Sequence, residues 1–367
     1  MSPGVNEPRR VRFLDLGLLC GVALAAALVW SLLGGVLGGG GTSLSALETT
    51  TTAEPQPARR AITTSTTSST STTSTTTTTP PRPAWPLTAL TATDVDPIHN
   101  HAVAVKFDAH PSVRSYDGVE RADLVFEELV EGGLTRFVGV FHSSVPERAG
   151  PVRSIRTSDF NLLANLGRPL VGFSGGNDLT LQALYATDLV PAPPVGWAAR
   201  YYSRSSKRRA PHDLEVQLAG LSEASTIEEP AQSPFARGPL TAAGVPVDAV
   251  DIPFSNMTSL TMRWDPERGE WIRHDRRGLL TDPAGLPLGW TNVLILRTVY
   301  GRSPYDHRSP EVQSVGQGTG LLLHGGTATP FNWSRPAPTS PYELTGIDGA
   351  EVNIPPGRTL VELEPSR

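Results

Sequence analysis

The sequence feature that most constrains this chain is a segment near its N-terminus, residues 16–41, that has no charged side chain. Most of its residues are apolar, and about 20 apolar residues are enough to cross a bilayer as a helix. Three arginines precede the segment, and the next basic residue is Arg59. The positive-inside rule therefore predicts a cytoplasmic N-terminus over 1–13, a transmembrane signal anchor over 14–38 and a body on the extracytoplasmic side of the cell membrane.

A cleaved signal peptide is the alternative interpretation of this segment. Signal peptides usually have shorter apolar cores, of about 7–15 residues, that end at a cleavage site made of small residues. Residues 38–46 are rich in small side chains and leave that cleavage open. Cys20 is the only cysteine in the sequence, so no internal disulfide is expected. It follows Leu19 early in the apolar run, which does not match the position of a lipid-modified cysteine.

A Thr/Ser-rich stretch follows, in which residues 63–79 contain no other residue type. This stretch has no apolar side chains to bury, so nothing offsets the conformational entropy that would be lost on ordering it. Together with the proline-rich residues 80–86, it predicts a disordered linker over 42–90. The folded body is therefore expected to begin near residue 97.

Apolar periodicity predicts an α+β fold in two parts for this body. In the first part, 97–220, strand-like and helix-like patterns alternate, which indicates an α/β-like layer with a mixed sheet. Residues 221–246 lack periodicity and predict a linker, and the second part, 247–367, is expected to be mostly β. The expected elements are strands at 102–107, 123–130, 134–142 and 168–174, helices at 159–166 and 178–185, and a hairpin over 259–275 with its turn at 266–269.

Eight blocks of this body occur in an order and spacing that are typical of one protein family. They are AVAVKFDAHP (102–111), ADLVFEELVEGGLTRFVGVFHS (122–143), PERAGPVRSIRTSD (146–159), SGGN (174–177), RRAPHDL (208–214), TMRWDPERGEWIR (261–273), TNVLIL (291–296) and DGAEVNIPPGRTLVEL (348–363). Through these blocks the chain resembles the bacterial family DUF3048, the YerB-like proteins. The resemblance implies an N-terminal and a C-terminal part over roughly 97–365 and a body anchored outside the membrane, often as a lipoprotein. It implies no reaction, and Asp213 stands where the family more often has Asn.

An acidic group marks the first hairpin, in which Glu131-Gly132-Gly133 is expected to connect the strands 123–130 and 134–142. Glu127 and Glu128 should point to opposite faces, because successive side chains of a strand alternate. The inward-facing carboxylate then needs a partner, such as Arg136 on the return strand or an arginine described next. The functional interpretation is a general acid or base at Glu127 or Glu131, and the structural alternative is a Glu–Arg network.

A basic pair, Arg153 and Arg156, precedes the helix expected at 159–166, which Ser158 or Asp159 is expected to cap. Arginine presents a planar fork that binds a carboxylate or phosphate with two hydrogen bonds, and a helix start adds free N–H groups. These residues predict an anion site for a wall polymer, a lipid phosphate or a peptide carboxylate. The alternative is that both arginines are occupied by the glutamates of the hairpin.

A G-x-S-x-G pattern at 172–176 lies between an expected strand and an expected helix, where a nucleophile elbow would place its serine. Asp188 and His212 follow Ser174 in the order that α/β-hydrolases use. The preceding chain lacks the repeated βα units of such a fold, so a tight turn or a ligand-binding glycine loop is an alternative.

Histidines near the start of the body, His99, His101 and His110 close to Asp108, raise the question of a metal site. Zinc needs further ligands that would have to come from distant parts of the chain, so surface or turn histidines are expected and no metal or cofactor is predicted. His212 differs, because Arg208 and Arg209 flank it in the sequence.

These observations predict a binding or scaffold module at the bacterial cell envelope that recognises an anionic or polymeric ligand. A polymer, lipid or protein of the envelope is the expected partner, together with the membrane through the N-terminal helix. The formal net charge of −5 argues against nucleic acid as a partner. The alternative function is a wall-active hydrolase that uses a glutamate or a Ser174/His212 pair. The predicted ligand-binding residues are Arg136, Arg153, Arg156, Ser174, Gly175, Gly176 and His212.

Overall fold

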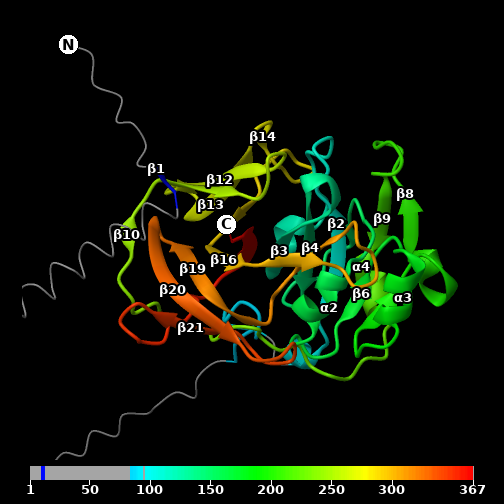
Figure 1. Cartoon of the computed structure of the whole chain (residues 1–367). Helices are drawn as coiled ribbons and strands as arrows, with labels where there is room; N and C mark the ends of the chain where they lie inside the picture. The colour runs from blue at the N-terminus through cyan, green and yellow to red at the C-terminus, as the bar shows by residue number, and fades with distance from the viewer. Residues whose placement is uncertain (1–9, 13–82, 94–95, 367) are drawn as a thin grey trace, which may run out of the picture. The chain divides into compact units, whose positions relative to one another are not determined.

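Strands outnumber helices in the computed structural model, which describes residues 10–12, 83–93 and 96–366 (Figure 1). A wide mixed sheet contains β2 (Val103–Asp108), β3 (Leu124–Leu129), β4 (Thr135–Phe141), β6 (Leu170–Gly172), β7 (Val190–Ala192), β10 (Val245–Pro246), β16 (Asn292–Thr298), β19 (Gly316–His324), β20 (Thr327–Arg335), β21 (Glu343–Gly346) and β22 (Thr359–Pro365). Its strands follow the order β10-β20-β19-β16-β22-β3-β4-β2-β6-β7, and β21 pairs with β20. The regular structure of the described residues is therefore mostly sheet, with few helices.

The predicted hairpin of the first part is confirmed, because β3 and β4 pair antiparallel with Glu128 opposite Arg136. Gly132 and Gly133, in the connection between them, both have a φ of 70°, a left-handed conformation that favours glycine. β22, the last strand of the chain, lies between β16 and β3 and is parallel to both. The strands of the two predicted parts thus continue one sheet.

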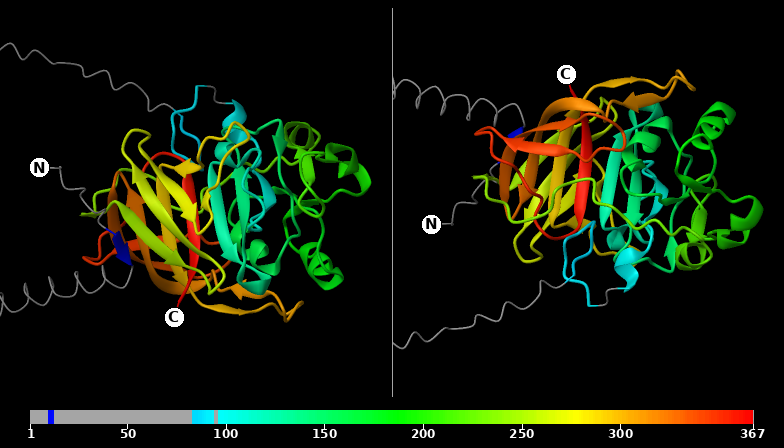
Figure 2. Two further views of the ribbon diagram at one scale, coloured as in Figure 1. Left: turned by 90° about the horizontal axis from the view of Figure 1, so that it is seen from above. Right: turned by 90° about the horizontal axis from the view of Figure 1, so that it is seen from below.

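A second sheet contains β1 (Arg10–Arg12), β11 (Ala249–Pro253), β12 (Ser259–Asp265), β13 (Glu270–Asp275), β14 (Gly278–Leu279) and β15 (Gly289–Trp290). The hairpin predicted over 259–275 is confirmed, because Asp265 and Glu270 are paired across its turn. Figure 2 shows these yellow-green strands beside the orange and red strands of the wide sheet. Two small sheets complete the fold: β5 (Arg148–Ala149), β8 (Tyr202–Arg204) and β9 (Leu214–Gln217) form one, and β17 (Tyr300–Arg302) pairs with β18 (Pro310–Val312).

Both faces of the wide sheet are buried, as the alternating side chains of β16 illustrate. Val293 and Ile295 belong to a core that they share with Met262 and Trp271 of the second sheet. Leu294 and Leu296 point to the opposite face, into a core that includes side chains of the helical layer. Because both faces are covered, the sequence of β16 has a continuous run of apolar residues instead of an alternation of apolar and polar ones.

The helices within the described residues are short: α2 (Thr157–Leu163), α3 (Asp178–Leu184) and α4 (Leu218–Glu223), with 3-10 turns η1 (Asp96–His99), η2 (Val119–Arg121), η3 (Glu131–Gly133) and η4 (Gly196–Tyr201). The expected helix at 178–185 is confirmed as α3. The expected helix at 159–166 begins two residues earlier, so Asp159 is not its cap. Asp159 instead lies in the first turn and accepts the backbone N–H of Arg156 at 2.7 Å.

Two segments that were predicted as linkers contain packed residues. At the end of the predicted linker 42–90, Leu87 and Thr88 are fully buried, and the Gly357 N–H donates to the Thr88 carbonyl at 2.8 Å. Within 221–246, the buried Phe235 ring stacks on Tyr342 at a centroid distance of 5.0 Å. Both segments are held to the body by apolar side chains. The spacing of these side chains is too irregular to show a helical or strand period in the sequence.

The predicted anchor, 14–38, lies outside the described residues, as does most of the linker 42–90. Among the residues that are described, the helices are too short and insufficiently apolar to cross a membrane. β1 pairs in parallel with β11. If 14–38 crossed a membrane, β1 and β11 would lie on opposite sides of it, so this pairing contradicts the prediction of a cytoplasmic N-terminus over 1–13.

Candidate functional site

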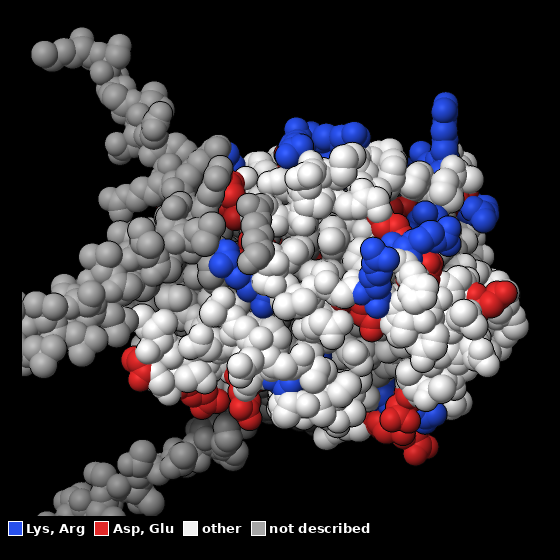
Figure 3. Space-filling view, viewed as in Figure 1, with Lys and Arg blue, Asp and Glu red and all other residues white. Residues whose placement is uncertain are grey.

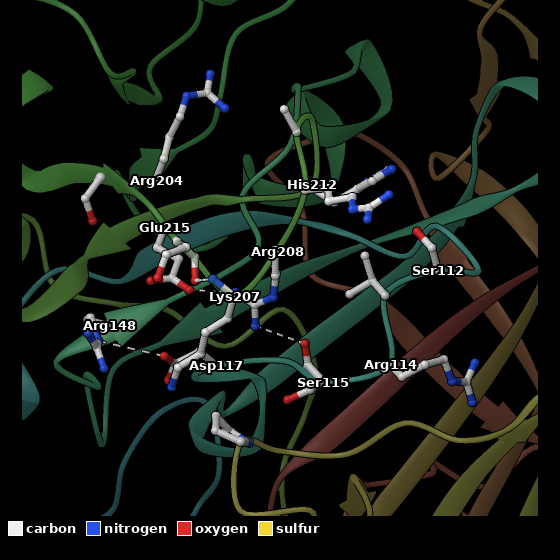
Figure 4. A pocket seen from close by; sticks show the side chains of 17 residues that line it. Ser112, Arg114, Ser115, Asp117, Arg148, Arg204, Lys207, Arg208, His212 and Glu215 are labelled. Atoms are coloured by element: carbon white, nitrogen blue, oxygen red, sulfur yellow. Dashed lines mark hydrogen bonds and ion pairs between the residues drawn. The ribbon is translucent and has the colours of Figure 1, made fainter.

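A cavity of about 990 Å³ opens beside the β8–β9 hairpin. Figure 4 shows the side chains around it, and Figure 3 shows basic side chains gathered over the β8–β9 end of the molecule. Its basic lining residues are Arg114, Arg148, Arg204, Lys207, Arg208 and Arg209, and its acidic lining residues are Asp117 and Glu215. The lining therefore has an excess of positive charge, although the whole chain has a formal charge of −5.

Four of these basic side chains already have an acidic partner. The pairs are Arg208 with Glu215 at 2.6 Å, Arg204 with Asp213 at 2.6 Å, Arg114 with Asp275 at 2.6 Å and Arg148 with Asp117 at 3.8 Å. Lys207 and Arg209 are exposed, and neither has an acidic partner within 4.0 Å among the described residues. These two side chains are therefore the cations most available to a ligand.

The loop between β8 and β9 holds this cluster in place. The two strands pair antiparallel, and the Ser205 N–H donates to the Asp213 carbonyl at 2.7 Å at the base of the loop. Nearer the tip, the His212 N–H donates to the Arg209 carbonyl at 2.9 Å. The run RSSKRR at 204–209 consequently places its basic side chains around one cavity.

Asp108, at the end of β2, fixes His212 at the edge of this cavity. The carboxylate is 3 % exposed, and its Oδ2 lies 2.5 Å from His212 Nδ1. Its Oδ1 accepts the backbone N–H of His110 at 2.9 Å, and the His110 ring stacks on His212 at 4.6 Å. Burial, followed by the neighbouring His212, lowers the pKa of His110. Within the described ranges, no group of three His, Cys, Asp or Glu side chains could hold a metal ion.

A smaller cavity of about 510 Å³ neighbours the first and shares Ser203 and Arg204 with it. Arg153 and Ser174, two predicted site residues, line this second cavity. Arg153 Nε lies 3.2 Å from Asp108 Oδ2, and its Nη1 donates to the Pro211 carbonyl at 3.3 Å. The loop thus brings Arg153, Ser174 and His212 into neighbouring cavities.

The Ser174/His212 pair expected of a hydrolase is not formed. Ser174 Oγ lies 3.4 Å from Ser154 Oγ, and the hydrogen-bond partner of His212 Nδ1 is Asp108. The Ser174 N–H donates to the Arg153 carbonyl at 2.9 Å, and the Ile155 N–H to the Gly175 carbonyl at 2.9 Å. The glycine loop therefore packs against the strand-like segment 153–155, where its backbone makes ladder-like hydrogen bonds.

Arg156 forms an ion pair with Glu131. This is the structural alternative to the predicted anion site. Arg156 Nε and Nη2 donate to the two carboxylate oxygens of Glu131 at 2.7 and 2.8 Å. Burial raises the pKa of Glu131, but hydrogen bonds from Arg156 and Ser309 outweigh that effect and lower it to about 2. A carboxyl that stays ionised in this way is poorly suited to act as a general acid. Neither residue lines the two cavities described above.

Arg136 lies beside these groups and is 8 % exposed. Its Nη1 donates to the Ser154 carbonyl at 2.9 Å. Burial, followed by the nearby Arg156 charge, lowers the pKa of Arg136 to about 10. This environment makes it a structural cation beneath the loop 153–156.

Glu127 and Glu128 point to opposite faces of β3, as the alternation predicts, but their partners differ from those expected. Arg273 of β13 binds Glu127 through two hydrogen bonds of 2.8 and 2.7 Å, and both side chains are buried. Glu128 contacts Lys106 of β2 on the other face. Glu127 is therefore inaccessible to a substrate in this structure.

Two family models match this chain. The DUF3048 N-terminal domain, described as a protein of unknown function, matches residues 87–231, and the DUF3048 C-terminal domain matches residues 250–361. Together the matches span well over half of the sequence. The chain belongs to the DUF3048 family. This confirms the resemblance seen in the sequence blocks.

Two comparisons with individual proteins agree with this membership. The Bacillus subtilis (strain 168) protein named "Putative lipoprotein YerB" is 24 % identical over 300 residues, which cover 76 % of this chain and 86 % of that protein. The crystal structure of the YerB protein from Bacillus subtilis superposes with a TM-score of 0.66 at 21 % identity. That match covers 78 % of this chain and 97 % of the crystallised chain, and it shows a shared fold.

The basic cavity is formed almost entirely by the DUF3048 N-terminal region, since Pro283 is its one lining residue outside 87–231. The sequence interpretation placed Arg208 and Arg209 beside His212 but missed Arg114, Arg148, Arg204 and Lys207 as companions. The density of basic residues in RSSKRR could have indicated Arg204 and Lys207. Arg114 and Arg148 gave no local signal, because they join the cavity through the fold.

Proposed function

We propose that this chain is a binding module of the bacterial cell envelope that recognises an anionic ligand through the basic cavity beside β8 and β9. The supporting observation is the excess of cationic side chains around a cavity of about 990 Å³, including the exposed Lys207 and Arg209. Charge-assisted hydrogen bonds to a carboxylate or phosphate are stronger than neutral ones. A cavity open to solvent also suits one segment of a longer polymer.

His212, which lines the basic cavity, and Arg153, which lines the smaller cavity, are proposed to extend this surface. Both are partly exposed, and both are held by Asp108. Arg156 is not part of the proposed surface, because its guanidinium group is already paired with Glu131. A hydrolase with Ser174 and His212 as its catalytic pair is disfavoured by the absence of a hydrogen bond between them among the described residues.

The envelope location rests on the family and on the uncharged segment 16–41. A relative whose printed name is that of a lipoprotein supports attachment to a membrane. We propose that the uncharged segment provides the attachment in this chain, in place of an acylated cysteine. It would enter the membrane from one side without crossing it, so that β1 and β11 stay on the same side.

A binding experiment with defined anionic polymers tests this proposal. The full chain is titrated with a phosphodiester polymer, with polyglutamate and with a neutral polysaccharide, and affinity is measured at two salt concentrations. Binding of an anionic polymer that weakens with salt, together with no binding of the neutral polymer, is the expected result. The K207Q/R209Q variant should lose more than tenfold in affinity, because each charge-assisted hydrogen bond contributes about 1.5–3 kcal/mol.

The matched control is R168Q/R302Q, which removes the same charge from exposed positions outside the cavity. It should bind within about twofold of the unmodified chain, since distant surface charges are screened by salt. Equal losses in both double variants would indicate a general charge effect and reject the cavity as the site. The proposal also fails if none of the anionic polymers binds.

A further inference from the structure

A buried lysine lies between two buried carboxyl groups on the face of the wide sheet that α2 covers. Lys106 of β2 contacts Glu128 of β3, and its Nζ lies 2.7 Å from Asp159 Oδ1 of α2. All three side chains are at most 1 % exposed. Lys106 is one of only two lysines in the sequence. This cluster lines neither of the two cavities described above, so it plays no part in the proposed ligand binding.

Apolar side chains border this cluster, and Arg136 of β4 is paired with Glu128 across the sheet. Ala104, Phe126 and Val138 belong to the same buried core face of the sheet, and Leu162 of α2 belongs to that core as well. Ionised groups are costly in such surroundings, so an amine and a carboxyl there gain by sharing a proton as neutral groups. An amine that has passed a proton to a neighbouring carboxylate has a free electron pair and is nucleophilic.

Asp159 is held in one orientation by two contacts. Its Oδ1 faces the Lys106 amine, while its Oδ2 accepts the backbone N–H of Arg156 at 2.7 Å. A backbone N–H in that position stabilises negative charge that develops on Oδ2 when a nucleophile adds to the carboxyl carbon. The oxygen that faces the amine is then the one free to leave.

Glu128 is placed to move protons between the other two groups. Burial raises the pKa of Glu128 to about 7, an effect that Lys106 opposes and Asp159 reinforces. A carboxyl with this pKa both donates and accepts a proton at neutral pH. Its second oxygen, Oε2, is buried and has no hydrogen-bond partner.

We propose that Lys106 and Asp159 form an intramolecular amide bond, with Glu128 as the catalytic proton carrier. The Lys106 ammonium first passes a proton to Asp159 Oδ1. The neutral nitrogen then adds to the Asp159 carboxyl carbon, and Glu128 relays a second proton from the nitrogen to Oδ1. The carbon–Oδ1 bond breaks and one water molecule leaves. Glu128 returns to its initial protonation state. No oxidant or other reactant is consumed.

Proximity makes this condensation feasible without an enzyme. Groups fixed at contact distance in a water-excluding site react with very high effective concentrations. The product would tie β2 to α2, closing the chain between residues 106 and 159. Such a bond braces an extracytoplasmic body whose sequence has one cysteine and therefore no internal disulfide.

Mass spectrometry of the denatured full chain tests the proposal. The expected protein is lighter than its sequence mass by one water molecule. Trypsin should fail to cleave after Lys106 and should release a branched peptide that joins the Lys106 and Asp159 peptides. A chain with no such loss and with free Lys106 would overturn the proposal, as would a water loss that maps to other residues.

Three variants isolate the chemistry. D159N replaces the leaving oxygen by nitrogen, so the same bond should form with loss of ammonia in place of water. E128Q keeps the size of Glu128 but cannot relay the proton, so the bond should be absent or form at least tenfold more slowly. E343Q changes an exposed glutamate of β21 and should form the bond as the unmodified chain does. An E128Q chain that forms the bond at the unmodified rate would refute the assigned role of Glu128.

Discussion

The buried pair Arg273–Glu127 connects the second sheet to the wide sheet, and its removal should strongly destabilise the fold. Arg273 is 3 % exposed and Glu127 is fully buried. Two hydrogen bonds, of 2.8 and 2.7 Å, link the guanidinium to the carboxylate, and Thr135 donates a third to Glu127 at 2.6 Å. The R273M variant preserves an apolar stem but leaves the Glu127 carboxylate without its cation.

The expected loss of stability can be estimated from the free energy needed to neutralise the buried carboxylate that remains without a partner. Glu127 can take up a proton, and protonating an ordinary glutamate at pH 7 costs about 3.7 kcal/mol, given a usual pKa of about 4.3 and about 1.36 kcal/mol per unit. This agrees with the loss of about 3–5 kcal/mol that is typical when one partner of a buried pair is removed. We therefore expect R273M to lower the free energy of unfolding by about 3–5 kcal/mol at pH 7.

The same reasoning predicts how the loss changes with pH. The folded variant holds a proton that its unfolded chain lacks, so the variant gains stability as the pH falls. Between pH 7 and pH 5 the deficit relative to the unmodified chain should shrink by about 2.7 kcal/mol. The E127Q/R273M double variant should abolish this pH dependence, because it removes the group that takes up the proton.

Urea unfolding at pH 7 and pH 5 measures these differences, with each variant compared with the unmodified chain at the same pH. The control is R168M, which breaks the exposed pair Arg168–Glu229. That change should cost less than about 1 kcal/mol at either pH, as exposed pairs usually do. A deficit for R273M below about 1 kcal/mol, or one that is equal at both pH values, would refute the reasoning.

Two further predictions concern the wide sheet. Burial raises the pKa of Glu362 well above its usual value, so folding stability should fall with rising pH above the usual glutamate value, by up to about 1.36 kcal/mol per pH unit. E362Q should flatten that slope in urea unfolding while E343Q retains it, and equal slopes for both variants would contradict the assignment. G320A should lower the stability by about 1–3 kcal/mol, because the added Cβ would overlap the Phe331 ring and lie 2.6 Å from the Ile295 carbonyl oxygen. An unchanged melting temperature in G320A would contradict this expectation.

Local patterns predicted the elements of the fold well where a single segment contains the whole signal. The β3–β4 hairpin, the hairpin over 259–275 and the helix α3 follow from alternation, turn glycines and apolar spacing. The position of β22 between β16 and β3 could not be predicted in the same way. Strand order is decided by packing between distant segments, and the alternation within β22 is hidden because both its faces are buried.

Side-chain partners were harder to predict than elements, for a physical reason. A carboxylate that must be buried binds whichever cation the fold brings to its face, and that cation can lie far along the chain. Arg273 is 146 residues from Glu127, so no spacing rule relates them. Arg156 and Glu131 were nearer in sequence, and both the anion-site hypothesis and the network hypothesis fitted them until their geometry was known.

The same principle explains why the basic cavity is a better candidate for ligand binding than the arginines beside α2. A cation that already has a carboxylate partner must lose that partner before it can bind a ligand, which weakens the net gain. Arg156 has this disadvantage, with two hydrogen bonds to Glu131. Lys207 and Arg209 do not, since no carboxylate within the described residues reaches either of them. An anionic ligand is the partner that we propose for these two exposed cations at the cavity.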